Sequence, residues 1–288
     1  FTELHRAQYF YKPEGDLTTG LEKIIKFGNQ VQAGATRTTG SLFGENDLPE
    51  IRAPKIPFCE PWSLTTKLEK EKEVTGIYLS GHPLDNFRFE IKHYYITPIN
   101  EMLDYQTAML QSKTMKERPF RIAGFVTEAT DRVSKNGNKY GNLTIEDYTG
   151  HYQVNLFGED YARFSRYLQG GFCLFLQGSL KYRMYRENEV EFKVQFIQLL
   201  EEVKKQQTRQ IELQALPEAI TPEIVNFLAG NINTHPGKTE LCWQLTDETE
   251  NLKVKLKSFS KKVELNDDLT RFLEKQVVIN VRINIFNN

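Results

Sequence analysis

The sequence predicts a multi-domain protein, mainly β plus α, with a helical segment, a five-stranded barrel and a small α+β domain in that order. Three observations lead to this prediction. The chain has 288 residues, which is more than a single domain usually holds. Its hydrophobic period changes from helical to alternating near residue 118. A final segment mixes helical and alternating periods.

The first 62 residues contain one amphipathic stretch and one irregular stretch. Leu21, Ile24 and Ile25 lie on one helical face, and Gly28 is expected to end that helix. Threonine, glycine and proline accumulate in residues 31–62, so we expect an extended linker there. The adjacent pair Leu42-Phe43 interrupts it. Insertion into a partner's pocket and packing against this chain remain equally open for that pair.

Residues 63–115 are expected to form a helical connecting segment. Ser63 is a typical N-cap before a helix that should run to Ser80-Gly81-His82-Pro83. His82 lies in this helix-ending turn, where a local hydrogen bond is a simpler role than catalysis. Thr97-Pro98 places proline at the start of a second, shorter helix.

In residues 116–204 hydrophobic and polar residues alternate, which predicts a β-barrel domain. Three strands are predicted around Phe120–Val126, Leu143–Ile145 and Tyr152–Leu156, with a tight turn at Asn136-Gly137 between the first two. A helix over 159–168 and two further strands follow. This is the order of the oligonucleotide-binding (OB) fold, whose helix lies between strands three and four. A β-sandwich is the simpler alternative, but it does not need a helix at that place.

Residues 205–288 are predicted to form the small α+β domain. Thr221-Pro222 should open a helix that Gly230 ends. A strand over 252–256, a helix over 267–275 and a strand over 277–285 complete it.

The two loops that flank the binding face of an OB-fold combine basic and aromatic residues. Cations can neutralise phosphates, and aromatic rings can stack on bases, so these loops suit single-stranded nucleic acid. The alternative is that the loops are charged because they are solvated. Residues 118–204 carry 12 Lys plus Arg and 11 Asp plus Glu, a net charge of +1, so binding should be modest and salt-sensitive. The candidate residues are Arg132, Lys135, Asn136, Lys139 and Tyr140 in the first loop, and Lys181, Tyr182, Arg183, Tyr185 and Arg186 in the second.

No pattern in the chain points to catalysis or a bound metal. The sequence has no phosphate-binding glycine loop and no nucleophile motif. Its three cysteines are far apart, which argues against a zinc site and favours a reducing, cytoplasmic setting. Asp147 fits a turn residue, and Glu159-Asp160 suit the first turn of a helix. No apolar run approaches the roughly 20 residues that a membrane helix needs.

Several motifs resemble one family. Residues 71–85 read Glu-Lys-Glu-Val-Thr-Gly-Ile-Tyr-Leu-Ser-Gly-His-Pro-Leu-Asp, which is similar to a signature of the bacterial DNA polymerase III alpha subunit. The barrel agrees through Ile122–Val126, Lys135–Gly137, Leu143–Gly150 and Val154–Phe157. The likeness covers most of residues 1–200 and is weak after about 210.

This resemblance implies a C-terminal fragment of the catalytic polymerase, and a chain that starts with Phe1 instead of Met fits that expectation. Residues 1–30 then correspond to the end of the helical fingers and helix-hairpin-helix region. The palm aspartates and their magnesium belong to the parent DNA-directed DNA polymerase, upstream of this fragment, so no cofactor is expected in the fragment itself.

The resemblance also implies partners: single-stranded template DNA at the barrel, the tau subunit of the clamp loader at residues 205–288, the sliding clamp (beta subunit), and other holoenzyme subunits. The family's clamp motif has the form Gln-x-x-Leu-Phe. Thr39, Leu42 and Phe43 occupy the matching place, with threonine where glutamine is expected. Two other functions compete with this interpretation: a tRNA-binding barrel of an aminoacyl-tRNA synthetase, and a barrel with a purely structural role.

Overall fold

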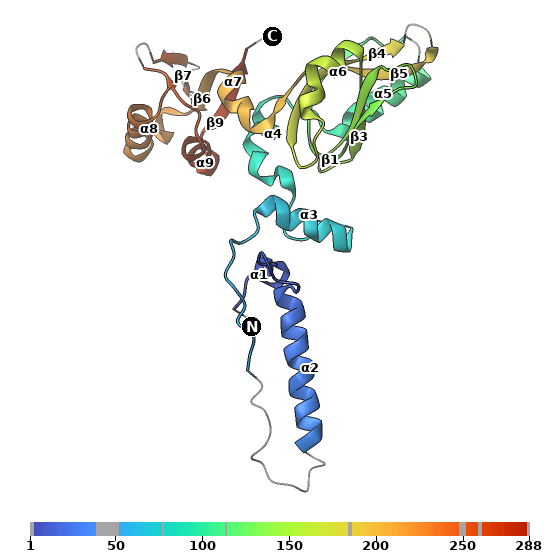
Figure 1. The fold of residues 1–288 in the computed structure, drawn as a ribbon. Helices are drawn as coiled ribbons and strands as arrows, with labels where there is room; N and C mark the ends of the chain where they lie inside the picture. The colour runs from blue at the N-terminus through green and yellow to red at the C-terminus, as the bar shows by residue number, and fades with distance from the viewer. Residues whose placement is uncertain are drawn as a thin grey trace. The chain divides into compact units, whose positions relative to one another are not determined.

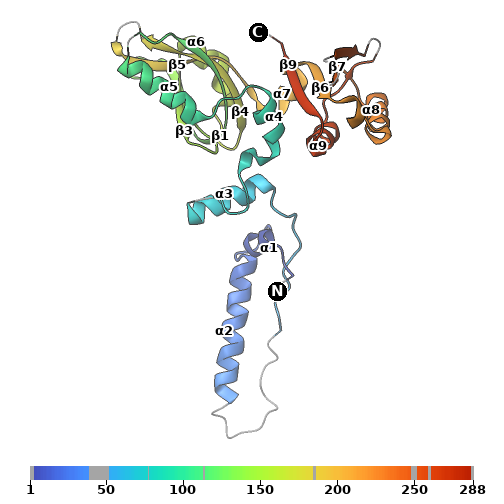
Figure 2. The same ribbon diagram turned by 180° about the vertical axis from the view of Figure 1, so that it is seen from behind.

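The computed structural model describes residues 3–38, 52–76, 78–112, 114–183, 186–247, 252–258 and 261–286. The chain divides into two compact units, Phe1–Gly81 and His82–Asn288. Figure 1 labels their helices and strands, and Figure 2 shows the same ribbon from behind. The clamp-motif residues Thr39, Leu42 and Phe43 lie outside the described residues.

The first unit is helical in its described parts. It contains α1 (Arg6–Phe10), α2 (Gly20–Thr38) and α3 (Leu64–Thr75). The predicted helix end at Gly28 and the predicted start of a linker at residue 31 are both wrong, because α2 continues to Thr38. A glycine inside a helix costs only about 1 kcal/mol, which the good helix formers around it, among them Gln32 and Ala33, can offset.

Helix α3 and the loop after it are held by polar contacts of Ser63 and Glu71. Ser63 caps the helix as predicted, accepting a hydrogen bond from the Thr66 amide at 3.1 Å, but the helix ends at Gly76, whose φ of 79° is left-handed. Glu71 then holds the following loop: its carboxylate accepts from the Ser80 hydroxyl at 2.5 Å and the Ser80 amide at 2.8 Å. The hydroxyl bond is the main cause that lowers the pKa of Glu71 to about 2.

The second unit opens with η1 (Pro83–Phe87), α4 (Arg88–His93) and α5 (Ile99–Gln111). His82 caps η1, since its Nδ1 accepts a hydrogen bond from the Leu84 amide at 3.1 Å. The prediction of a local hydrogen bond for this histidine is confirmed.

The barrel follows the predicted order of three strands, a helix and two strands. Its antiparallel sheet runs β3-β2-β1-β4-β5, with β1 hydrogen-bonded to β2 and β4 on its two sides. The edge strands β3 and β5 form no hydrogen-bonded ladder within the described ranges, so the barrel is not closed. The elements are β1 (Arg118–Val133), β2 (Lys139–Glu146), β3 (His151–Phe157), α6 (Gly158–Phe164), β4 (Cys173–Arg183) and β5 (Arg186–Leu199).

The barrel core is built from inward-facing strand residues and from α5. Ile122, Leu143 and Leu174 have no exposed surface, as expected where every second residue of a strand faces the core. Ile99 and Met102 of α5 belong to the same cluster, so this helix completes the barrel core. Its N-terminus is held by Asp147, whose carboxylate accepts a hydrogen bond from the Ile99 amide at 2.8 Å.

The C-terminal domain is α+β, as predicted, with the sheet order β8-β7-β6-β9. Helix α8 connects β6 to β7, which run parallel. Strands β6 and β7 were not predicted from the sequence. Helix α8 continues past the predicted end at Gly230 to Thr234, and the last strand begins at Asn280, three residues after its predicted start. The elements are α7 (Val203–Gln207), β6 (Thr208–Ala215), α8 (Pro222–Thr234), β7 (Pro236–Asp247), β8 (Leu252–Lys257), α9 (Asp267–Lys275) and β9 (Asn280–Ile285).

Helix α4 is tied to α7 and β6 by buried polar contacts. Glu90, only 1% exposed, forms an ion pair with Lys204 at 3.2 Å. Lys204 also pairs with Asp267 at 2.6 Å. The Tyr94 hydroxyl lies 2.5 Å from the Thr208 hydroxyl, a bond between buried side chains.

Candidate nucleic-acid interface

A row of one cation and two aromatic rings crosses three strands on the outer face of the barrel. In the strand register, Arg132 of β1 is opposite Tyr140 of β2, which is opposite Phe157 of β3. Residues directly opposite in antiparallel strands point to the same face. That face is outward, because the alternate residues of β2, such as Leu143, are buried. We call Arg132, Tyr140 and Phe157 the outer row.

The two aromatic rings of the outer row are suited to stacking. The Tyr140 and Phe157 rings are stacked, with centroids 5.7 Å apart and planes 21° from parallel. Phe157 is 52% exposed. A base could therefore extend this stack from the solvent side, as bases do on the exposed aromatic rings of single-strand binding proteins.

The turn between β1 and β2 places further cations beside the outer row. Gly137 adopts a φ of 78° at the predicted Asn136-Gly137 turn, so the hairpin is confirmed. Lys135, Asn136 and Lys139 are exposed. Within the described ranges, neither these lysines nor Arg132 has a carboxylate partner. These three cations are therefore available to bind phosphate groups.

The predicted residues near the β4–β5 connection lie in a different environment. The Arg183 guanidinium is bonded to Glu189 and Glu191, each at 2.7 Å, and both carboxylates raise the pKa of Arg183. Lys181 lies 3.9 Å from Glu117. Tyr182 donates its hydroxyl hydrogen toward the Met109 carbonyl at 3.2 Å, where it anchors β4 to the end of α5. The structure thus brings Tyr140 and Arg132 to the outer row but engages Arg183 and Tyr182 within the barrel domain.

Two of the predicted residues cannot be placed in the same way. Tyr185 lies outside the described residues, and Arg186 is described only through its backbone, as the first residue of β5.

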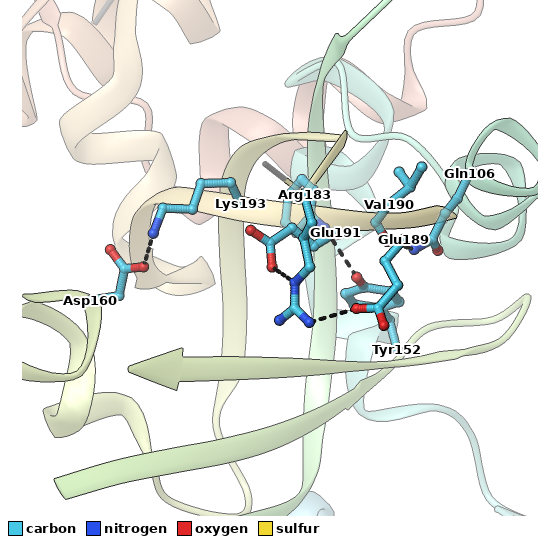
Figure 3. Close-up of polar contacts among 9 residues, drawn as sticks. Gln106, Tyr152, Asp160, Arg183, Glu189, Val190, Glu191 and Lys193 are labelled. Carbon is cyan, nitrogen blue, oxygen red and sulfur yellow. Dashed lines mark hydrogen bonds and ion pairs between the residues drawn. The ribbon is translucent and has the colours of Figure 1, made fainter. Parts of the chain in front are cut away.

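A groove continues from the outer row along the open seam between β3 and β5. One hollow of about 550 Å³ is lined by Phe157, by the cations Arg163, Lys181 and Lys193, and by the carboxylates Glu159 and Asp160, among others. A second, of about 160 Å³, is lined by Phe157, Arg183 and Lys193, among others. Figure 3 shows Lys193 paired with Asp160, and Arg183 between its two glutamates. We call this feature the seam groove.

Sequence reasoning missed Phe157, Arg163 and Lys193. For Phe157 a signal was present: His151, Gln153 and Asn155 alternate with the buried Val154 and Leu156, so residue 157 had to face outward. For Lys193 and Arg163 the sequence holds no such signal, because their proximity depends on how the sheet curves.

The described parts of the chain contain no group of three or more His, Cys, Asp or Glu side chains placed to hold a metal ion. Among the helices described, none is long and apolar enough to cross a membrane.

Comparison with known proteins matches both domains of the second unit. Residues 210–284 match the family described as the C-terminal domain of the DNA polymerase III alpha subunit, and residues 120–200 match the OB-fold nucleic acid binding domain. The DNA polymerase III alpha subunits of Pasteurella multocida and Escherichia coli K12 are each 22% identical, over 77% and 78% of this chain. The chain is thus similar to bacterial DNA polymerase III alpha subunits over about three quarters of its length.

The chain spans 18% and 20% of the length of these two alpha subunits. The alpha subunit of Vibrio cholerae is 26% identical over 53% of the chain. Among solved structures, the mitochondrial single-stranded DNA binding protein Rim1 of S. cerevisiae is 22% identical, with a TM-score of 0.23. It covers 30% of this chain and 96% of its own, and at that score it adds nothing to the strand order described above.

Proposed function

We propose that this chain is the C-terminal region of a replicative DNA polymerase III alpha subunit whose barrel contacts the single-stranded template. The observation that carries the proposal is the outer row, with an arginine and two stacked aromatic rings beside two exposed lysines. In this proposal the polymerase reaction and its magnesium belong to another part of the parent protein.

The outer row and the adjacent turn offer both a surface for base stacking and cations for the phosphates. The Tyr140 and Phe157 rings offer a stacking surface that any base can use, so binding would depend little on sequence. Arg132, Lys135 and Lys139 would neutralise a few phosphates and release their counterions, which makes the affinity fall with added salt. A contact of this size is weak alone and suits a polymerase that must keep moving along its template.

Replacing Phe157 with alanine tests this proposal. Loss of one base–aromatic stack costs about 1–3 kcal/mol, so we expect the Kd for an oligothymidylate to rise by roughly tenfold. Arg132→Ala should also weaken binding and reduce the slope of log K against log salt by about one. The measurement is a fluorescence anisotropy titration of the whole chain at several salt concentrations.

Phe58→Ala is the matched control, because it removes another ring that is 72% exposed, in the other unit. Phe157→Trp should keep most of the affinity, since it keeps a stacking surface. Unchanged binding in both Phe157→Ala and Arg132→Ala would refute the template contact. A preference for folded tRNA over single-stranded DNA would favour the synthetase-type barrel.

We further propose that Leu42 and Phe43 anchor the sliding clamp. The support is the similarity of residues 39–43 to the family's clamp motif. Leu42→Ala/Phe43→Ala should abolish measurable binding to the clamp, whereas Thr39→Gln should strengthen it by restoring the motif's first residue. Surface plasmon resonance on immobilised clamp measures both, and an unchanged response in the two variants would contradict the assignment.

For residues 205–288 we propose docking to the tau subunit of the clamp loader. The support is the match of residues 210–284 to the C-terminal domain family of alpha subunits, taken together with the family motifs found in residues 71–157.

A further inference from the structure

Two cations of the seam groove already have anionic partners within the barrel domain, whereas Arg163 donates to the Gln195 carbonyl at 3.2 Å. Arg183 is held by Glu189 and Glu191, and Lys193 is paired with Asp160. In the outer row and the adjacent turn, by contrast, Arg132, Lys135 and Lys139 have no carboxylate partner in the described parts of the chain. The two cationic regions meet at Phe157, which belongs to the outer row and lines both hollows of the groove.

The Arg183 guanidinium already binds two anions that the barrel domain itself supplies. The Glu191 carboxylate accepts from Nε and the Glu189 carboxylate from Nη1, each at 2.7 Å. Guanidinium groups bind carboxylates and phosphates with the same donor fork. All three side chains are about 40% exposed (38% for Arg183, 42% and 41% for the two glutamates). Ion pairs at such exposure contribute little to stability, so they can exchange for another anion.

We propose that the seam groove is a second section of the single-strand path, in which Asp160, Glu189 and Glu191 occupy the places of backbone phosphates. This inference rests on the proposed function of the outer row. A short oligonucleotide would bind the outer row alone. A longer one would continue past Phe157 into the groove, where its phosphates must displace the carboxylates. The glutamates therefore keep the affinity for long single strands low.

The double variant Glu189→Gln/Glu191→Gln tests this proposal in the whole chain. The OB-fold occupies about 4–16 nucleotides, so the probes are thymidine oligonucleotides of about 4 and about 14 nucleotides. We expect the variant to bind the long probe roughly tenfold more tightly at low salt, with a steeper salt dependence, and to bind the short probe as before. Adding Arg183→Ala to the double variant should remove the gain.

Glu240→Gln/Asp268→Asn is the matched control. It removes two carboxylates that also pair with cations, Lys257 and Arg271, in the C-terminal domain. An equal gain in this control, or an equal gain for both probes in the test variant, would mean that only net charge matters and would overturn the proposal. No gain for the long probe, with normal binding of the short one, would overturn it while leaving the outer row intact. Failure of the wild type to bind either probe would instead refute the proposed function.

Discussion

Replacing Lys204 with methionine is expected to lower the free energy of unfolding by about 3–5 kcal/mol at pH 7, because it leaves a buried carboxylate without its partner. Glu90 is 1% exposed and lies 3.2 Å from Lys204, which is itself only 14% exposed. Water cannot replace the ammonium group at that depth. Urea denaturation of the two proteins measures the difference.

The loss of stability in Lys204→Met should grow as the pH rises, because Glu90 is buried. Burial raises the pKa of Glu90 above its ordinary value, while Lys204 opposes that rise. Without the lysine, the folded protein binds a proton on Glu90 more tightly than the unfolded chain does. The stability that protonated Glu90 contributes is fully present below its unfolded pKa of 4.5. It is lost as the pH rises through the higher pKa of the folded state. The variant should therefore be closer to wild type at pH 5 than at pH 8.

A second substitution separates this cause from lost packing. Lys204→Met/Glu90→Gln removes the buried charge together with its partner, so it should recover part of the stability and lose the pH dependence. If Lys204→Met and the wild type have the same unfolding free energy at pH 8, the Glu90–Lys204 ion pair is not needed for stability.

Replacing Asp147 with alanine is expected to destabilise the barrel by about 2–4 kcal/mol, since hydrogen bonds to a charged group contribute more than neutral ones. Its Oδ1 accepts from the Thr149 amide at 2.7 Å and the Gly150 amide at 2.9 Å. Its Oδ2 accepts from the Ile99 amide at 2.8 Å, at the first turn of α5. One side chain therefore closes the β2–β3 turn and caps a helix 48 residues away in the sequence.

The graded variant Asp147→Asn sharpens this prediction. Its amide oxygen can still accept from the turn, but its amino group cannot accept from Ile99, so the loss should be intermediate. Hydrogen exchange should show faster exchange at the start of α5 in both variants. Asp268→Ala, which removes an exposed carboxylate 3.7 Å from Arg271, is the control and should change stability little. Equal stability of Asp147→Ala and wild type would mean that the cap is dispensable.

Much of the barrel could be predicted from local sequence because its signals are local. Alternation along β1 to β5, the Asn136-Gly137 turn and the acidic first turn of α6 each depend on neighbouring residues only. The same reasoning missed β6 and β7 in the C-terminal domain. In β6, Ile211 and Leu213 alternate, but the polar run before them hides a strand that is stabilised by its neighbours β7 and β9. Context of that kind overrides local propensity.

Some residues of the candidate site could be predicted from the sequence, and others could not. The residues of the β1–β2 turn were predictable, because a hairpin turn is exposed to solvent however its two strands pair with the rest of the sheet. The sequence-based hypothesis for Arg183 assumed that a basic residue near a loop is open to solvent anions. Its partners Glu189 and Glu191 lie on the next strand, and only the β4–β5 register brings Glu191 to Arg183.

By itself the sequence determined the strand order, the place of the helix between strands three and four, and the outward direction of Tyr140. The tertiary structure decided which outward residues are neighbours. Arg132, Tyr140 and Phe157 form one row because the register of three strands aligns them, and register depends on pairing between segments instead of on either segment alone. The tertiary structure also decided which cations remain available to phosphate groups, because the folded sheet sets the distance between each cation and the nearest carboxylate.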